Sequence, residues 1–256
     1  MTRTMPKTVL ITGGAKRIGK AITESLAASG WATAIHYFGS SDEAAALAKS
    51  INAANGNATI FSADLSDPNE TTDLIPAVVD TLGPIGALIN NASVFEEESW
   101  DDVTLESWTK HLGINLHAPF LLSQAFARAL PDNAEGSIVN IIDQRVLNLT
   151  PEFMSYTVSK SGLWTLTQTL AMALAPRIRV NGVGPGPTLP NERQTDEVFQ
   201  RQVSATPMRR KVELSDITAA VTYLLTARTV TGEMIAVDSG EHLGWTQPVE
   251  GQSFNG

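Results

Sequence analysis

A tyrosine and a lysine four residues apart point to proton-transfer chemistry. Tyr156 and Lys160 lie in a stretch, residues 154–174, whose apolar pattern predicts a helix. Residues four apart share one helix face, so the ammonium should lie beside the phenol. A positive charge favours the phenolate, and we therefore expect a lowered pKa that makes Tyr156 a general acid near neutral pH. The same spacing also occurs by chance on ordinary amphipathic helices.

A second candidate acid stands where a buried strand is expected to end. Residues 137–142 are nearly all apolar, as in a strand buried on both faces, and Asp143 follows them directly. Open α/β sheets bind ligands at the carboxyl edge of their strands. A carboxylic acid there suits protonation of a ring nitrogen while hydride adds to carbon. Alternatively, Asp143 caps the next turn or pairs with Arg145.

The turn between the first predicted strand and the first predicted helix is rich in glycine. Glycines let backbone N–H groups approach a phosphate, and a helix N-terminus favours negative charge. The turn therefore predicts a nucleotide-phosphate site, although a glycine turn without a ligand would have the same sequence. The candidate cofactor residues here are Gly13, Lys16, Arg17, Ile18 and Gly19.

The end of the second predicted strand bears on the choice of cofactor. NAD-binding sites usually carry an acid there for the ribose, and here no acid occurs before Asp42. Arg17 could neutralise a 2′-phosphate, with His36, Ser40 and Ser41 as hydrogen-bond partners. This favours NADP(H), unless Arg17 is simply a solvated charge at the helix start.

Strand-length apolar runs alternate with helical patterns along the chain, which predicts right-handed βαβ units and a parallel sheet. We expect one doubly wound α/β (Rossmann) domain over residues 1–256, with a seven-stranded parallel sheet and helices on both faces. Residues 184–211 lack a clear strand and are expected to cover the ligand crevice, and residues 244–256 form a tail without periodicity. The predicted strands are 8–12, 31–37, 58–62, 85–90, 137–142, 178–183 and 234–238, and the predicted helices are 18–29, 42–54, 70–82, 105–129, 154–174 and 215–226.

Composition excludes several classes of function. The chain has no cysteine, so a disulfide framework, a thiolate zinc site and a cysteine nucleophile are excluded. Its net charge of −9 argues against a nucleic-acid partner. No apolar run is long enough to span a bilayer, and no signal-peptide core follows the first residues. We expect a cytoplasmic protein with a small-molecule substrate, and the histidine spacing suggests no metal.

Along the chain, the glycine turn at 12–19, the segment Asn90-Asn91-Ala92-Ser93 and the pair Tyr156 and Lys160 occur in the same order as the motifs of the short-chain dehydrogenase/reductase superfamily. The resemblance covers about the whole chain. The resemblance implies that Asn115 joins Tyr156 and Lys160 as a catalytic residue that fixes a water, and that Lys160 binds the nicotinamide ribose. It also implies further cofactor contacts from Asp64, Leu65, Asn91, Ala92, Ser93, Pro185, Gly186 and Thr188.

Two departures from the common pattern resemble the pteridine reductase branch, which includes bacterial dihydromonapterin reductases with dihydrofolate activity. Arg17 replaces the middle glycine of the turn, and Asp143 replaces the usual catalytic serine. The pair His36-Tyr37 also resembles that branch and adds Tyr37 to the cofactor residues. The branch often continues with His-Arg-Ser, and here Phe38 and Gly39 stand in place of the histidine and the arginine. By resemblance, the substrate is pterin-like and its contacts are Arg17, Ser93, Phe95, Asp143 and Tyr156, with Phe95 stacked on the ring opposite the nicotinamide.

These observations predict an NADPH-dependent reductase of a pterin or dihydropterin, with dihydrofolate as a further candidate substrate. Two alternatives stay open at this point. The first is a carbonyl or 3-oxoacyl reductase of the same superfamily, and the second is a non-catalytic NADP-binding sensor. Phe95 could also be ordinary core, and Asn115 could form a plain helix-to-strand hydrogen bond. The helices at 105–129 and 154–174 resemble those that form the superfamily's tetramer interface, which implies a homotetramer.

Overall fold

The computed structural model describes residues 3–190 and 195–244, and the tail expected at 244–256 therefore lies outside it except for Gly244. The strands are β1 (Thr8–Ile11), β2 (Ala32–Tyr37), β3 (Asn57–Ser62), β4 (Ala87–Asn90), β5 (Gly136–Ile141), β6 (Ile178–Pro185) and β7 (Met234–Val237). The α-helices are α1 (Arg17–Ala28), α2 (Ser41–Ala53), α3 (Pro68–Leu82), α4 (Leu105–Leu112), α5 (Ala118–Ala129), α6 (Met154–Leu174), α7 (Asp196–Ala205) and α8 (Leu214–Thr226).

All seven strands pair in parallel in the order β3-β2-β1-β4-β5-β6-β7, which confirms the predicted doubly wound sheet. The central strand β1 contributes Val9, Leu10 and Ile11, all with no exposed surface. A strand covered on both faces buries every side chain, which explains why its sequence is continuously apolar and does not alternate. The order reverses between β1 and β4, and a crevice is expected above that point.

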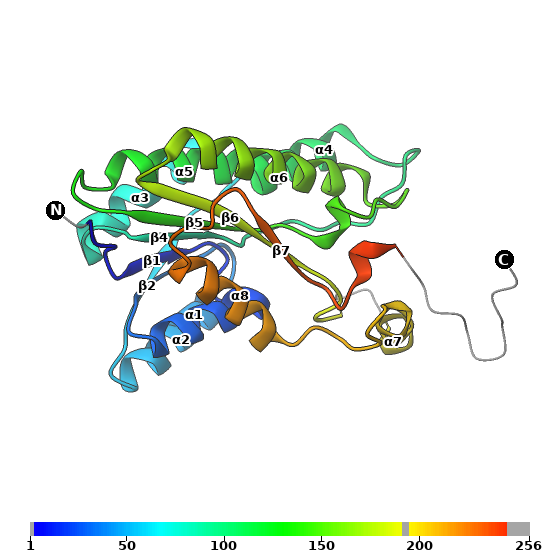
Figure 1. Cartoon of the computed structure of the whole chain (residues 1–256), viewed down its shortest axis with the longest axis horizontal. Helices are drawn as coiled ribbons and strands as arrows, with labels where there is room; N and C mark the ends of the chain where they lie inside the picture. The colour runs from blue at the N-terminus through cyan, green and yellow to red at the C-terminus, as the bar shows by residue number, and fades with distance from the viewer. Residues whose placement is uncertain (1–2, 191–194, 245–256) are drawn as a thin grey trace, which may run out of the picture.

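Helices cover both faces of the sheet (Figure 1). The helices α1, α2 and α8 lie on one face, and α3, α4, α5 and α6 lie on the other. Local signals set the helix ends. For example, the carboxylate of Asp67 accepts from the N–H groups of Asn69 and Glu70 at the start of α3, and Gly83 ends that helix with φ 81°. None of the described helices combines the length and the apolar composition that crossing a bilayer requires.

The long helix predicted at 105–129 is interrupted in the structure. A π-helical turn, Gly113–His117, separates α4 from α5 and contains the buried side chain of Asn115. π-Turns are rare and often mark functional sites, because the extra residue re-aims a side chain. The apolar periodicity continues through the turn, so the sequence pattern alone did not reveal it.

The segment after β6 lies beyond the carboxyl edge of the sheet (Figure 1). Helix α7 stands apart from the main helical layers, close to the short 3-10 turn η3 (Glu241–Leu243) that follows β7. Strand β6 also runs to Pro185, two residues beyond the predicted end at 183. Part of the predicted covering region, residues 191–194, lies outside the described residues.

Candidate active site

A cavity of about 660 Å³ opens at the carboxyl edge of the sheet, where a doubly wound fold is expected to bind its ligand. Most of the candidate residues from the sequence line this cavity, although Tyr37, Ser40, Ser41 and Asn115 do not. The candidate residues that line it are Gly13, Lys16, Arg17, Ile18, Gly19, His36, Asp64, Leu65, Asn91, Ala92, Ser93, Phe95, Asp143, Tyr156, Lys160, Pro185, Gly186 and Thr188.

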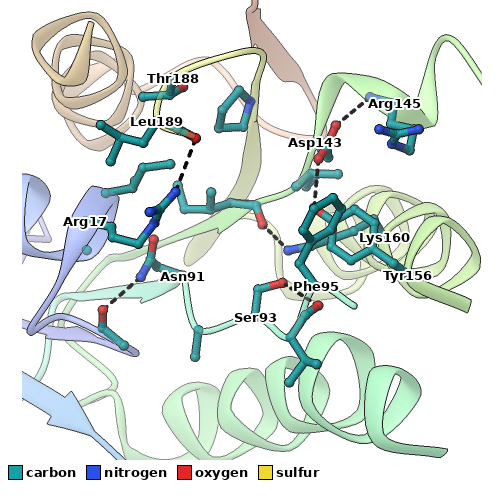
Figure 2. Close-up of a pocket in the computed structure, with 18 of the residues that line it drawn as sticks. Arg17, Asn91, Ser93, Phe95, Asp143, Arg145, Tyr156, Lys160, Thr188 and Leu189 are labelled. Carbon is teal, nitrogen blue, oxygen red and sulfur yellow. Dashed lines mark hydrogen bonds between the residues drawn. The ribbon is translucent and has the colours of Figure 1, made fainter. Parts of the chain in front are cut away.

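Asp143 and Tyr156 are brought together from different elements (Figure 2). Asp143 follows β5, and Tyr156 projects from the first turn of α6. The Tyr156 hydroxyl donates to Oδ2 of Asp143 at 2.7 Å, and the backbone N–H of Arg145 donates to Oδ1 at 2.8 Å. Asp143 therefore caps the short turn after β5 and also contacts the phenol, so both sequence interpretations of it hold geometrically.

The prediction that the pKa of Tyr156 is lowered is wrong. Burial raises the pKa of Tyr156 well above its usual value of 10, and the adjacent carboxylate of Asp143 raises it further by charge and hydrogen bonding. The ammonium of Lys160 lies 5.7 Å from the centre of the tyrosine ring, whereas Asp143 touches the phenol directly. Tyr156 therefore keeps its proton through the physiological pH range and can act as a donor.

Lys160 is held beneath the phenol by the sheet. Its Nζ donates to the carbonyl of Ile141 at 2.8 Å, and only 2% of the residue is exposed. Burial lowers the pKa of Lys160 to about 8, because desolvation disfavours the charged form, and Asp143 opposes this shift. The ammonium thus titrates close to physiological pH.

Asn115 supports the loop that follows β4. Its Nδ2 donates to the carbonyl of Val94 at 2.9 Å and to Oγ of Ser159 at 3.1 Å, and its Oδ1 accepts from the N–H of Val94 at 2.8 Å. The side chain is fully buried. In this structure Asn115 therefore fixes the start of the loop that carries Phe95 and joins it to α6.

The glycine turn fits a pyrophosphate. No side-chain cap and no acid occupies the first turn of α1, so its N-terminal N–H groups are open to an anion. A Cβ on Gly19 would lie 2.1 Å from the carbonyl oxygen of Gly13, and Gly13 itself has φ 59°. Asn91 holds the turn by donating to the carbonyls of Thr12 and Gly13. The close approach explains why only glycine is tolerated here.

His36 does not fit the role of a phosphate partner. Its Nδ1 accepts from the N–H of Gly13 at 3.0 Å, and its Nε2 faces the carbonyl of Ala63 at 3.0 Å. These contacts assign the neutral ring with the proton on Nε2. Burial also lowers the pKa of His36, with only 2% of the residue exposed. Both ring nitrogens are engaged, so His36 supports the glycine turn.

The two cations of the turn point in different directions. The Arg17 guanidinium donates to the carbonyls of Leu189 and Pro190 at 3.3 and 3.0 Å, on the side of the segment after β6 (Figure 2). Lys16 instead lies 2.6 Å from Glu43, in the first turn of α2. Lys16 therefore lies on the side of α2, and Arg17 lies on the side of the segment after β6.

Aromatic rings form one wall of the cavity. Phe95 stacks on Phe153, with ring centroids 4.5 Å apart and planes 10° apart. Phe95 and Tyr156 form a T-shaped pair, with ring centroids 4.7 Å apart. The Arg145 guanidinium covers Phe153 at 4.9 Å. Phe95 is 39% exposed and is therefore not ordinary core. The sequence analysis did not identify Phe153 as a site residue. Its position three residues before Tyr156, at the start of α6, was the available signal.

Two of the five described non-glycine residues with positive φ line this cavity. Arg17 and Phe153 both lie in the left-handed region, with φ 50° and 58°. This conformation costs a residue with a side chain about 1–2 kcal/mol, so the surrounding contacts must stabilise it. Strain of this kind concentrates at ligand-binding sites, which agrees with the position of both residues in the cavity wall.

Sequence reasoning also missed a polar cluster behind the aromatic wall. Glu98 and His111 are buried, and they contact Ser107 on α4 and Ser155 at the start of α6. Among residues 3–190 and 195–244, no three His, Asp or Glu side chains come together in a way that could hold a metal ion.

The family is established by comparison with known proteins. A family model described as short chain dehydrogenase matches residues 7–200. The chain belongs to the short-chain dehydrogenase family. Its sequence is 34% identical over 248 residues to an uncharacterized oxidoreductase of Methylorubrum extorquens, covering 94% of this chain and 99% of that protein. It is 29% identical over 252 residues to the 3-oxoacyl-[acyl-carrier-protein] reductase FabG of Staphylococcus epidermidis, covering 93% and 100%.

Among solved structures, this short-chain dehydrogenase is similar to FolM alternative dihydrofolate reductase 1 from Brucella canis, crystallised with NADP. The TM-score is 0.92 at 47% identity, over 97% of this chain and 98% of that one. The family uses a nicotinamide cofactor, and the glycine cradle described above fits one. The protein is thus an oxidoreductase that acts on a small molecule.

Proposed function

We propose that this protein reduces a pterin or dihydropterin, with dihydrofolate as a further candidate, and uses NADPH as the reductant. The observation that carries the proposal is the hydrogen bond of 2.7 Å between Tyr156 and Asp143 at the position where the family usually has a serine. Further support comes from the similarity to FolM alternative dihydrofolate reductase 1 from Brucella canis.

The cofactor would supply hydride from its nicotinamide. In this proposal the N-terminus of α1 and the glycine turn hold the pyrophosphate, Lys16 meets the 2′-phosphate, and Asp64 and Leu65 border the adenine. Lys160 and Thr188, which line the same cavity, would face the nicotinamide. We assign Asn91, Ala92, Ser93, Pro185 and Gly186 to the cofactor on the same basis.

The proton would come from the Asp143–Tyr156 pair. Reduction of a ring C=N bond places hydride on carbon and a proton on nitrogen. The high pKa of Tyr156, caused by burial and by Asp143, keeps the phenol protonated, so the pair always holds a proton to give. Lys160, while charged, stabilises the anion that remains on the pair, and solvent then returns the proton.

A flat heterocycle suits the aromatic wall. In the proposal the open face of Phe95 packs on the substrate ring, while Phe153 and Tyr156 hold Phe95 from behind and at its edge. Ser93 and Arg17 border the same space. The segment 184–211 would cover the ring, since Leu189, Phe199 and Gln202 already line the cavity.

The second candidate function is reduction of a 3-oxoacyl thioester, which the similarity to FabG favours. The usual serine donates a hydrogen bond to a ketone oxygen beside the tyrosine, and Asp143 replaces that serine here. Asp143 accepts hydrogen bonds on both carboxylate oxygens, so it meets a carbonyl oxygen with like charge. This difference in chemistry favours the nitrogen heterocycle.

Steady-state oxidation of NADPH separates the two candidates. Purified enzyme is assayed with 7,8-dihydropterin and dihydrofolate in one series and with acetoacetyl thioesters in another. We expect turnover with the heterocycles, and a kcat/KM for the thioesters at least about a hundredfold lower. Turnover of the thioesters alone would eliminate the proposal. Light scattering of the same preparation tests the expected homotetramer.

A further inference from the structure

Glu241 is a cavity residue to which neither the sequence patterns nor the comparisons assign a role. It begins the turn η3, which three residues separate from the end of β7, and it lines the same cavity as Phe95, Asp143 and Arg145. Its Oε2 is buried and has no hydrogen-bond partner among the described residues. A buried carboxylate oxygen without a donor is costly, which suggests that a ligand supplies one.

Three neighbouring elements hold Glu241 in place. Its Oε1 accepts from Nε2 of Gln202 on α7 at 3.2 Å. Its backbone carbonyl accepts from Nδ2 of Asn148, in the loop after β5, at 3.1 Å, and its backbone N–H donates to the carbonyl of Asp238 at 3.1 Å. The backbone of Glu241 is therefore positioned in advance of ligand binding, and only its carboxyl group has to turn. The last torsion of a glutamate is broad, so either oxygen can turn towards a donor in the cavity.

The groups around Glu241 on balance disfavour its charged form. Burial raises its pKa, and the nearby carboxylates of Asp143 and Asp238 raise it as well, while the hydrogen bond from Gln202 and the charge of Arg145 lower it. Asp238 is already satisfied by the N–H groups of Gly240 and His242 and by the ring of His242. A neutral N–H donor from a ligand would stabilise Glu241 without adding charge to the cavity.

We infer that Glu241 binds the substrate by accepting a hydrogen bond from the exocyclic amino group of a nitrogen heterocycle. This inference rests on the proposed function and sharpens it, because it names the substrate feature that is recognised. A substrate that offers only carbonyl oxygens to this wall would leave the carboxyl unpaired, and loss of such a contact discriminates strongly between analogues. Glu241 is thus a specificity residue, separate from the proton-donating pair Asp143–Tyr156.

The test compares two ligands against three variants. Equilibrium binding to the enzyme–NADP⁺ complex is measured for 7,8-dihydropterin and for its 2-desamino analogue, which lacks the exocyclic amino group. The variants are Glu241→Ala, Glu241→Gln and the matched control Glu233→Gln. Glu233 is exposed at the other end of β7 and makes the same change of charge without touching the cavity.

We expect Glu241→Ala to weaken binding of the amino compound about ten- to a hundredfold. Binding of the desamino analogue should change by less than about twofold, because the lost bond is to the amino group. Glu241→Gln keeps an oxygen acceptor and should fall in between, and Glu233→Gln should match the wild type. The affinity for NADP⁺, measured alongside, should stay constant and so report intact folding.

Two outcomes would overturn the inference, and only the second would also overturn the proposed function. If the Glu241 variants bind the amino compound as tightly as the wild type, or weaken both ligands equally, Glu241 does not recognise the amino group and the proposed function survives. If the wild-type complex binds neither heterocycle, the proposed function fails and the inference fails with it.

Discussion

The carboxylate of Glu98 accepts the backbone N–H of Ser155 at 2.6 Å, which ties the loop after β4 to the first turn of α6. The carbonyl of Glu98 also accepts from the N–H of Phe153 at 2.8 Å. The two contacts hold Phe95 and Phe153 in one stack beside Tyr156. The loop after β4, which carries Phe95, is therefore fixed relative to α6, which carries Tyr156.

Glu98→Gln should destabilise the protein by about 2 kcal/mol, because it removes charge-assisted hydrogen bonds in a buried place. Burial pushes the pKa of Glu98 up, but hydrogen bonds from Ser107 and Ser155 and the charge of His111 outweigh it, and the pKa is lowered below 4.5. The stabilisation is therefore complete above pH 4.5 and is lost as the pH falls through the folded-state pKa.

Urea titrations between pH 3 and 7 measure this effect. The wild type should lose stability more steeply below pH 4.5 than Glu98→Gln does. The exposed neighbour Glu97 supplies the control, since Glu97→Gln makes the same chemical change outside the cluster. Equal free energies of unfolding for both variants at pH 7 would show that the link contributes nothing.

Asp143→Ser should lower kcat for dihydropterin reduction about a hundredfold or more, the range expected for loss of a positioned acid. The glycine turn and α1 are untouched, so the dissociation constant of NADPH should change by less than about twofold. Stopped-flow measurement of hydride transfer and fluorescence titration of NADPH give the two quantities. An equal loss of both would mean that Asp143 is structural, as a cap of the turn at Arg145.

The activity should fall on the alkaline side with an apparent pKa near 8. Burial lowers the pKa of Lys160 to about 8, so the ammonium is present below this pH and is lost above it. A pH profile of kcat/KM for NADPH reports this group in the free enzyme. Lys160→Arg keeps its charge through this range and should abolish the alkaline limb, even if its maximum is lower. A limb unchanged in Lys160→Arg would assign the titration to another group.

Lys16 and Glu43 should affect the choice of cofactor in opposite directions. Lys16→Ala should reduce the preference for NADPH over NADH about tenfold, as expected for one charge-assisted contact. Glu43→Gln should increase the preference, because Glu43 now engages the Lys16 ammonium at 2.6 Å and competes with a phosphate. Dissociation constants for both cofactors provide the measure.

Arg17→Ala is the control for the effect of Lys16→Ala and Glu43→Gln on the preference for NADPH. Its guanidinium bonds the carbonyls of Leu189 and Pro190, so its loss should weaken both cofactors about equally. If Arg17→Ala alone lowered the ratio of NADPH to NADH affinity, the assignment of the 2′-phosphate to Lys16 would be wrong.

Local patterns in the chain were enough to specify the architecture. Continuous apolar strands such as β1 and β5 alternate with amphipathic helices, and this periodicity depends on neighbours along the chain alone. The bounds of α6 were predicted to the residue, and Tyr156 and Lys160 share its face as the spacing requires. The apolar run at 137–142 was likewise sufficient to place Asp143 at the carboxyl edge of the sheet.

Contacts between distant segments settled the rest. The pKa of Tyr156 depends on a carboxylate thirteen residues away, brought there by the packing of α6 against β5. The roles of His36 and Arg17 depend on Ala63 and Leu189, and Glu241 enters the cavity only because β7 ends beside β6. Sequence spacing cannot reveal these charges and distances, since burial and hydrogen-bond partners exist only after the chain has folded.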